Sequence, residues 1–405
     1  MNASTGERDQ LSVFLLIASI LALVLAIAGS MGMALLGIIT WFIDKSPAAS
    51  MTLVIAAAFM AMGVCTIPGI YHGYQGLQGR LQEQEDKPLR GWIYVSFLFP
   101  LALGLGYLAF NRGVLPALLG PLAHVSAATI PVVFALAIIL RKGSPISAKR
   151  IWGQFLAGLW ASPMVAFIVE ILAALVLLVI VFATLFQDII SQGLIEDFTR
   201  PEQWTEPYLV TKIQELTNQP LILILIMAFL ILFVPMLEEA IKTIGIWPVT
   251  RRGFTQSQAF IGGAIAGAGY GLFEAFFLGQ PGVSWVPVMV ARAGATMMHM
   301  ITTALTGLGI ARARESGRWS QAVRYYFGAV FLHSLWNISA LGVGVIMLFQ
   351  EDFTPLDIQP DLSFISGAAG VVLIALSLAA FLGLWLIPGK LLANEEDLST
   401  QMSEE

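Results

Sequence analysis

Apolar runs long enough to cross a lipid bilayer recur along this chain and constrain its fold more than any other feature. Of the 405 residues, 57% are hydrophobic and only 12% are charged, whereas soluble domains carry about 25% charged residues. One crossing takes about 20 apolar residues in a helix. Runs of this kind occupy residues 11–43, 50–71, 91–110, 116–140, 155–187, 220–247, 257–279, 286–311, 322–349 and 363–387. The sequence therefore predicts an all-α, polytopic transmembrane helical bundle of about ten spans.

Charged residues are divided between the two sides of the predicted bundle. The loops 141–150 and 312–324 and the short loop near Arg251 are basic, whereas the loops 188–219 and 350–362 are acidic. Because positively charged loops stay in the cytoplasm, both termini are expected there. No basic tract suits nucleic acid, so the expected surroundings are the lipid bilayer and membrane-bound partners.

Polar residues divide the chain into four regions. An N-terminal five-span membrane region (1–187) is followed by an extracytoplasmic polar loop (188–219) and then by a four-span membrane core (220–349) that contains most of the ionisable residues found within spans. The last region (350–405) holds the final span and an acidic cytoplasmic tail, which we expect to lack stable structure from Leu391 onward. Cys65 is the only cysteine, which excludes an intrachain disulfide and a cysteine-based zinc site.

Two adjacent glutamates lie near the end of the sixth run. Glu238 and Glu239 follow a strongly apolar stretch, and Lys242 lies four residues after Glu238 on the same helix face. A charged side chain at the bilayer centre costs about 2.5–3.5 kcal/mol on insertion scales. The pair either extends to the membrane surface with Lys242 as its counter-charge, or faces partners inside the bundle. Short acidic side chains reach the surface poorly, which favours the second interpretation.

The seventh and eighth runs each add an ionisable residue. Glu274 follows Gly263, Gly267 and Gly271, whose four-residue spacing predicts a helix that packs closely against a neighbour. His299 lies in the eighth run, with Arg292 seven residues before it and Thr303 four residues after it on one helical face.

The ninth run carries His333, with Asn337 one turn later. Each of these residues alone could be a satisfied core group. Each of four successive spans, however, carries a carboxylate or an imidazole. One shared polar cavity would satisfy all of these side chains together. Glutamate and histidine can activate water directly as general bases, or they can bind zinc. The residues Glu274, His299 and His333 are the candidate metal ligands, and the sequence leaves both alternatives open.

The ordered motifs resemble the PrsW family of intramembrane proteases, a relative of the CAAX prenyl endopeptidase and bacteriocin-processing superfamily. The resemblance covers about residues 220–345. It rests on E-E-x-x-K (Glu238 to Lys242), G-x-G-x-G-x-x-E (Gly267 to Glu274), H-x-x-x-T-x-x-x-G (His299 to Gly307) and H-x-x-W-N (His333 to Asn337). The related prenyl endopeptidases have a histidine where this chain has Glu274.

The resemblance implies an endopeptidase that cleaves a membrane protein or membrane-bound peptide, for example an anti-sigma factor in regulatory site-1-type proteolysis in a bacterial cell membrane. It implies Glu238 as the general base, Glu239 as its orienting partner, and Glu274 with His299 as the rest of the water or metal site. His333 and Asn337 would bind the scissile carbonyl. The alternative is a proton- or ion-coupled transporter with a buried Glu/His relay. A transporter should show matching repeats, and none is evident here.

Overall fold

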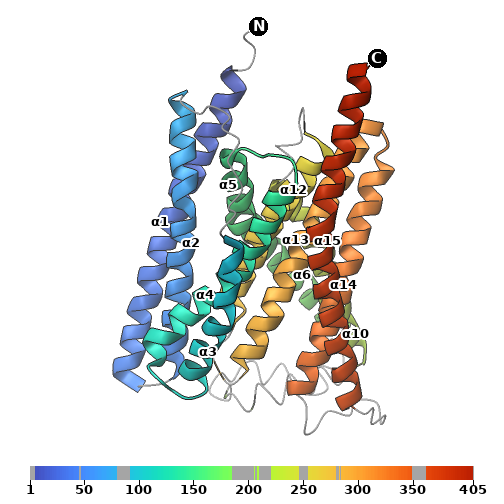
Figure 1. Cartoon of the computed structure of the whole chain (residues 1–405). Helices are drawn as coiled ribbons and strands as arrows, with labels where there is room; N and C mark the ends of the chain where they lie inside the picture. The colour runs from blue at the N-terminus through green and yellow to red at the C-terminus, as the bar shows by residue number, and fades with distance from the viewer. Residues whose placement is uncertain are drawn as a thin grey trace.

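The chain folds into a bundle of long helices. The N-terminal and C-terminal ends of the chain lie on the same side of this bundle (Figure 1). The computed structural model describes residues 5–44, 47–79, 92–184, 205, 208, 220–245, 254–279, 282, 284–348 and 362–404, and these contain no strand. The first half comprises α1 (Thr5–Asp44), α2 (Pro47–Leu77), the 3₁₀ helix η1 (Trp92–Leu98), α3 (Phe99–Phe110), α4 (Pro116–Lys142), α5 (Ala148–Leu156), the π-helix η2 (Ala157–Ala161) and α6 (Ser162–Thr184). The second half comprises α10 (Pro220–Ala228), the π-helix η4 (Phe229–Phe233), α11 (Val234–Lys242), the 3₁₀ helix η5 (Thr243–Gly245), α12 (Gln256–Phe277), α13 (Trp285–Ser316), α14 (Ser320–Leu348) and α15 (Leu362–Glu404).

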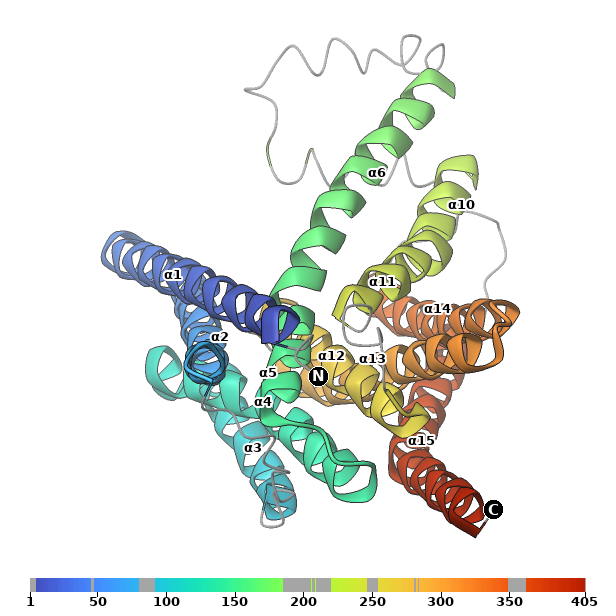
Figure 2. The ribbon, with the colours of Figure 1, turned by 90° about the horizontal axis from the view of Figure 1, so that it is seen from above.

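The predicted membrane bundle is confirmed, with one informative difference. Within the described residues, nine helical stretches are long and apolar enough to cross a membrane. The eighth predicted span, 286–311, forms most of α13 but is not among them. Residues 294–304 of α13 are all buried, and α13 lies beside α12 near the centre of the bundle (Figure 2). A helix surrounded by protein does not need a lipid-compatible surface, which is why α13 tolerates histidine, arginine and threonine.

The described parts of the basic loops gather at one end of the bundle, together with the C-terminal part of α15. Glu395 accepts hydrogen bonds from the Ser144 hydroxyl at 2.9 Å and from the Ser257 backbone N–H at 2.8 Å. Arg312 donates to Gln256 at 2.9 Å. The expectation of an unstructured tail from Leu391 is therefore wrong, because α15 continues to Glu404. Glu395 joins this part of α15 to Ser144 in the loop between α4 and α5 and to Ser257 in the first turn of α12. The predicted polar loop 188–219 lies outside the described residues except at positions 205 and 208.

Two π-helices each precede a proline by two residues. Pro163 follows η2 and Pro235 follows η4. Proline has no N–H to donate to the preceding turn, and a wider turn accommodates this missing bond. In the second case the Leu230 carbonyl accepts a hydrogen bond from the Asn337 side-chain amide at 3.1 Å.

Glycines bring α12 and α13 into contact. A Cβ added to Gly267 would lie 2.3 Å from the His299 carbonyl oxygen, and one added to Gly263 would lie 2.4 Å from the Thr303 carbonyl oxygen. At Gly271 the nearest atom would be the Thr296 Cα, at 2.8 Å. The predicted packing role of the four-residue glycine spacing is thus confirmed, and it brings Glu274 and His299 within reach of each other.

Candidate active site

The end of α11 carries a buried cluster of two carboxylates and one ammonium group. Glu239 and Lys242 are fully buried, and Glu238 is 6% exposed. The Lys242 Nζ lies 3.0 Å from Glu238 Oε2 and 2.9 Å from Glu239 Oε1. It also lies 4.3 Å from the centre of the Tyr270 ring. The glutamates therefore face the bundle interior, and the alternative of a pair at the membrane surface is excluded.

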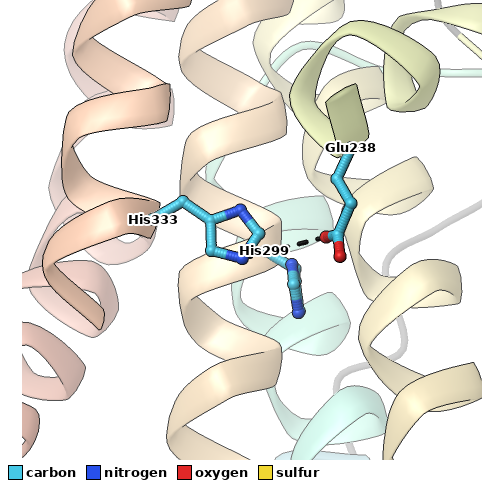
Figure 3. A group of neighbouring side chains, drawn as sticks. All are labelled: Glu238, His299 and His333. Carbon is cyan, nitrogen blue, oxygen red and sulfur yellow. Dashed lines mark ion pairs between the residues drawn. The ribbon is translucent and has the colours of Figure 1, made fainter. Parts of the chain in front are cut away.

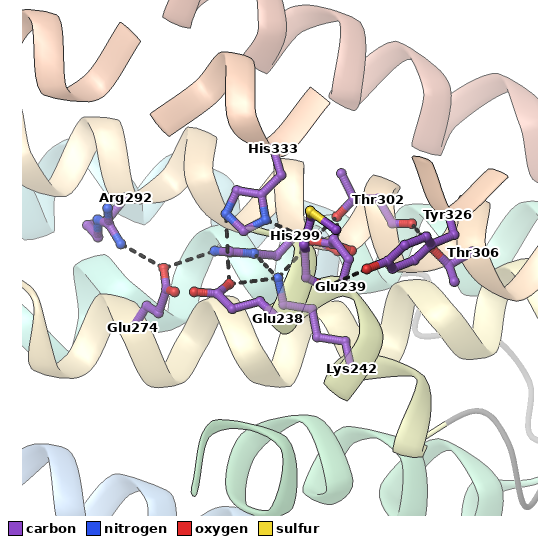
Figure 4. Close-up of polar contacts among 11 residues, drawn as sticks. Glu238, Glu239, Lys242, Glu274, Arg292, His299, Thr302, Thr306, Tyr326 and His333 are labelled. Carbon is purple, nitrogen blue, oxygen red and sulfur yellow. Dashed lines mark hydrogen bonds and ion pairs between the residues drawn. The ribbon is translucent and has the colours of Figure 1, made fainter. Parts of the chain in front are cut away.

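A third carboxylate, that of Glu274, links α12 to α13. Glu274 Oε2 accepts from Arg292 Nη1 at 2.9 Å and lies 2.9 Å from His299 Nε2. The other ring nitrogen of His299, Nδ1, lies 2.8 Å from Lys242 Nζ. An ammonium group can only donate, so Nδ1 accepts and Nε2 carries the proton given to Glu274. His299 is thus the bridge between Glu274 and the α11 cluster (Figure 4).

The α14 histidine completes the cluster from the opposite side. His333 Nδ1 lies 2.9 Å from Glu239 Oε1, and the Thr302 hydroxyl donates to the same oxygen at 3.1 Å. Because the carboxylate accepts, His333 carries its proton on Nδ1, which leaves Nε2 as an acceptor. Nε2 lies 3.8 Å from Glu238 Oε2. The His333 ring also stands nearly perpendicular to that of His299, with 5.0 Å between their centres.

Three of these residues converge on one small volume (Figure 3). One ligand atom each from Glu238, His299 and His333 lies within 4.8 Å of the other two, and all three residues are buried. Two imidazoles and one carboxylate form a ligand set of catalytic zinc sites, which keep a further position open. Glu239 is bonded to the remote nitrogen of His333, which is the usual orienting contact of a metal-binding histidine. The residues therefore fit a zinc ion chemically, although the Lys242 ammonium must leave Glu238 and His299 for a cation to bind both.

The sequence-based metal assignment differs from this arrangement in one residue. Glu274 was grouped with His299 and His333, whereas the structure brings Glu238 to the two imidazoles. Glu274 lies beyond His299 and is held by Arg292. The three glutamates of the cluster exceed its two cations, Lys242 and Arg292, by one charge when the imidazoles are neutral.

Other expected site residues occupy more peripheral places. Asn337 binds the Leu230 carbonyl. The Thr303 hydroxyl is buried without a hydrogen-bond partner among the described residues. Its neighbour Thr302, which the sequence reasoning missed, binds Glu239 instead. The available signal was its three-residue spacing from His299, which is as close on a helix surface as four.

His124 lies in a separate polar site. Its Nε2 lies 3.0 Å from the Phe276 carbonyl oxygen, and its Nδ1 accepts from Trp285 Nε1 at 3.1 Å. Both ring nitrogens are satisfied by neutral protein groups, so the role of His124 is structural.

A comparison with known protein families indicates what kind of protein carries this cluster. Residues 164–350 match the model of the PrsW family intramembrane metalloproteases. No curated protein and no solved structure matches the chain. The matched region runs from α6 to the end of α14 and contains every residue of the cluster, whereas α1 to α5 lie outside it. It favours a protease over the transporter alternative. Residues 164–350 of this multi-pass membrane protein are therefore an intramembrane protease region of the PrsW family.

Proposed function

We propose that the cluster around Glu238 hydrolyses a peptide bond of a membrane-anchored protein with water activated by glutamate and histidine. The observation that supports this is the convergence of Glu238, His299 and His333 ligand atoms within 4.8 Å in a buried site. A water-excluded setting strengthens the action of charged groups on a reacting carbonyl.

In this proposal Glu238 is the general base. Its carboxylate takes a proton from water while the water oxygen bonds to the scissile carbonyl carbon, and it returns the proton to the amide nitrogen as the carbon–nitrogen bond breaks. Lys242 lies 3.0 Å from Glu238 and provides positive charge next to the developing oxyanion. His333, held by Glu239 through Nδ1, presents Nε2 to the same space.

Zinc is the cofactor that the residues suit. When bound by Glu238, His299 and His333, the ion would supply a Lewis acid that polarises the carbonyl. Glu239 then remains as a nearby carboxylate, and its Oε2 is buried with no hydrogen-bond partner in the described part of the chain. Arg292 and Glu274 hold His299 in position in either form.

For the substrate, we propose a single-span regulatory protein of a bacterial cell membrane, cleaved in the manner of site-1-type regulatory proteolysis. The family match supports a membrane-embedded protein substrate. The gathering of basic loops on the side of the two chain ends supports a cytoplasmic location for both termini.

The test is cleavage of a panel of single-span, anti-sigma-type proteins by the purified protein in proteoliposomes. Glu238→Gln, His299→Ala and His333→Ala should each abolish cleavage, whereas Glu396→Gln, a change at an exposed glutamate of α15, should not. Wild-type activity that survives a chelator, with no zinc in the purified protein, would support the metal-free form. Cleavage by all three site variants at the wild-type rate would refute the assignment.

A further inference from the structure

A fourth glutamate, outside the cluster described above, faces it from α6. Glu170 is partly buried in α6, whereas Phe167 (59% exposed) and Ile168 (55% exposed) lie on the outward face of the same helix. Its Oε1 atom is buried and has no hydrogen-bond partner among the described residues. An unpaired carboxylate oxygen within a membrane span is costly, so it calls for a ligand.

The packing of α6 shows where this oxygen lies. Ala166, one helical turn before Glu170, forms a small buried cluster with Ile241 of α11 and Tyr270 of α12. Val169, the residue directly before Glu170, packs against the same cluster, as does Leu237. Glu170 is therefore level with the Leu237–Glu238 turn of α11 and lies within electrostatic range of Glu238, Glu274 and Lys242.

On the side of the site where Glu170 lies, the helices diverge from the centre of the bundle (Figure 2). The walls formed by α12 and α13 are closed by backbone-to-backbone packing. In contrast, α6 and the run from α10 to α11 extend away from the centre on one side of the bundle (Figure 2). Both expose apolar side chains there, among them Leu172 and Val176 of α6 and Leu221 and Ile224 of α10. These exposed apolar surfaces suit contact with a membrane-embedded substrate segment.

A substrate helix must unwind before its peptide bond can be cleaved, and this frees backbone N–H groups in an apolar environment. Each such group needs an acceptor. We propose that Glu170 is a substrate-binding residue, whose free carboxylate oxygen accepts hydrogen bonds from backbone N–H groups of the substrate next to the scissile bond. This inference rests on the proposed function of the Glu238 cluster.

The experiment compares Glu170→Gln, which keeps an oxygen acceptor, with Glu170→Leu, which removes it. Phe167→Leu, on the outward face of α6, is the matched control. A synthetic single-span peptide is cleaved by each full-length protein in proteoliposomes. Glu170→Leu should raise KM about tenfold with kcat within about twofold, because one charge-assisted hydrogen bond is lost. Glu170→Gln and Phe167→Leu should stay within about threefold of wild type.

Ester analogues of the peptide, in which one backbone N–H near the scissile bond is replaced by oxygen, identify the donor. For one of these analogues, the KM of the wild type should rise about tenfold, whereas the KM of Glu170→Leu should not rise further. Equal losses in both proteins, or an unchanged KM for Glu170→Leu, would overturn the proposal. The effect of the ester on wild type also serves as evidence if Glu170→Leu does not fold.

Binding separates this proposal from that of the catalytic cluster. The dissociation constant of a fluorescent form of the peptide is measured in the Glu238→Gln background with and without Glu170→Leu. If Glu170→Leu weakens binding about tenfold, the role of Glu170 is supported. This holds even if the wild type cleaves no peptide, in which case only the proposed function fails. Unchanged binding together with normal cleavage would refute the role of Glu170 alone.

Discussion

Two sites with buried histidines, one with His124 and the other with His299 and His333, show how the surroundings of an imidazole determine its possible role. His124 is bonded at both nitrogens to neutral groups, the Phe276 carbonyl and the Trp285 indole, and so joins three helices. In contrast, His299 and His333 lie among three carboxylates and an ammonium group. The first site is closed and structural. The second holds an unpaired charge and a ring nitrogen, His333 Nε2, that can serve a reaction.

The strongest test of this contrast is His333→Ala. Loss of its imidazole removes one of three converging ligand atoms, and cleavage should fall by about 10³-fold or more. Folding should be affected much less, because Glu239 keeps its contacts with Lys242 and Thr302. The measurement is the initial rate of cleavage per folded molecule, with monodispersity in detergent as the control. Retention of more than about a tenth of the rate would show that His333 is as structural as His124.

Replacement of Lys242 tests the charge balance on which the second group depends. Lys242→Met leaves Glu238 and Glu239 buried without their common cation, and breaking a buried ion pair costs about 3–5 kcal/mol. We expect a clear loss of unfolding free energy in mixed micelles. Lys142→Met should cost far less, since its ammonium lies over the Trp385 ring, 4.3 Å from the ring centre, and forms no ion pair with another described residue. Equal stabilities of the two variants would argue against a charged Lys242.

Gly267→Ala tests the helix contact that brings the reactive group together. Its Cβ would lie 2.3 Å from the His299 carbonyl oxygen, and backbone cannot move aside as a flexible side chain can. We expect a destabilisation of about 3 kcal/mol together with lost activity. Gly328→Ala is the control, because a Cβ at that helical position meets nothing within 4 Å. A Gly267→Ala protein with wild-type thermal stability would contradict this packing.

The smallest expected effect is that of His124→Ala, and it completes the comparison. The variant leaves the Trp285 N–H and the Phe276 carbonyl without their partner, at a cost of about 2 kcal/mol. Activity per folded molecule should remain within about twofold of wild type, because no member of the cluster contacts His124. A selective loss of kcat with unchanged stability would mean that the two histidine groups are coupled.

Much of the fold follows from patterns along the sequence. Apolar runs predict nine of the helices that can cross a membrane, and the spacing of Gly263, Gly267 and Gly271 predicts the α12–α13 contact. The prediction for the tail after Leu391 is wrong, because its helix is stabilised by hydrogen bonds of Glu395 with Ser144 and Ser257, more than a hundred residues earlier in the chain. Such long-range contacts cannot be predicted from the composition of the tail.

The sequence specifies a membrane bundle with carboxylates and imidazoles on successive spans of one region. Which of these side chains contact one another depends on how the helices pack in three dimensions. This packing joins Glu239 to His333, places Glu238 with both imidazoles, and sets Glu274 behind His299. The physical reason is that a helix turns its side chains by about 100° and advances about 1.5 Å per residue. Small differences in the rotation and depth of each helix, fixed here by glycine contacts and a π-turn before Pro235, therefore select the groups that come within bonding distance.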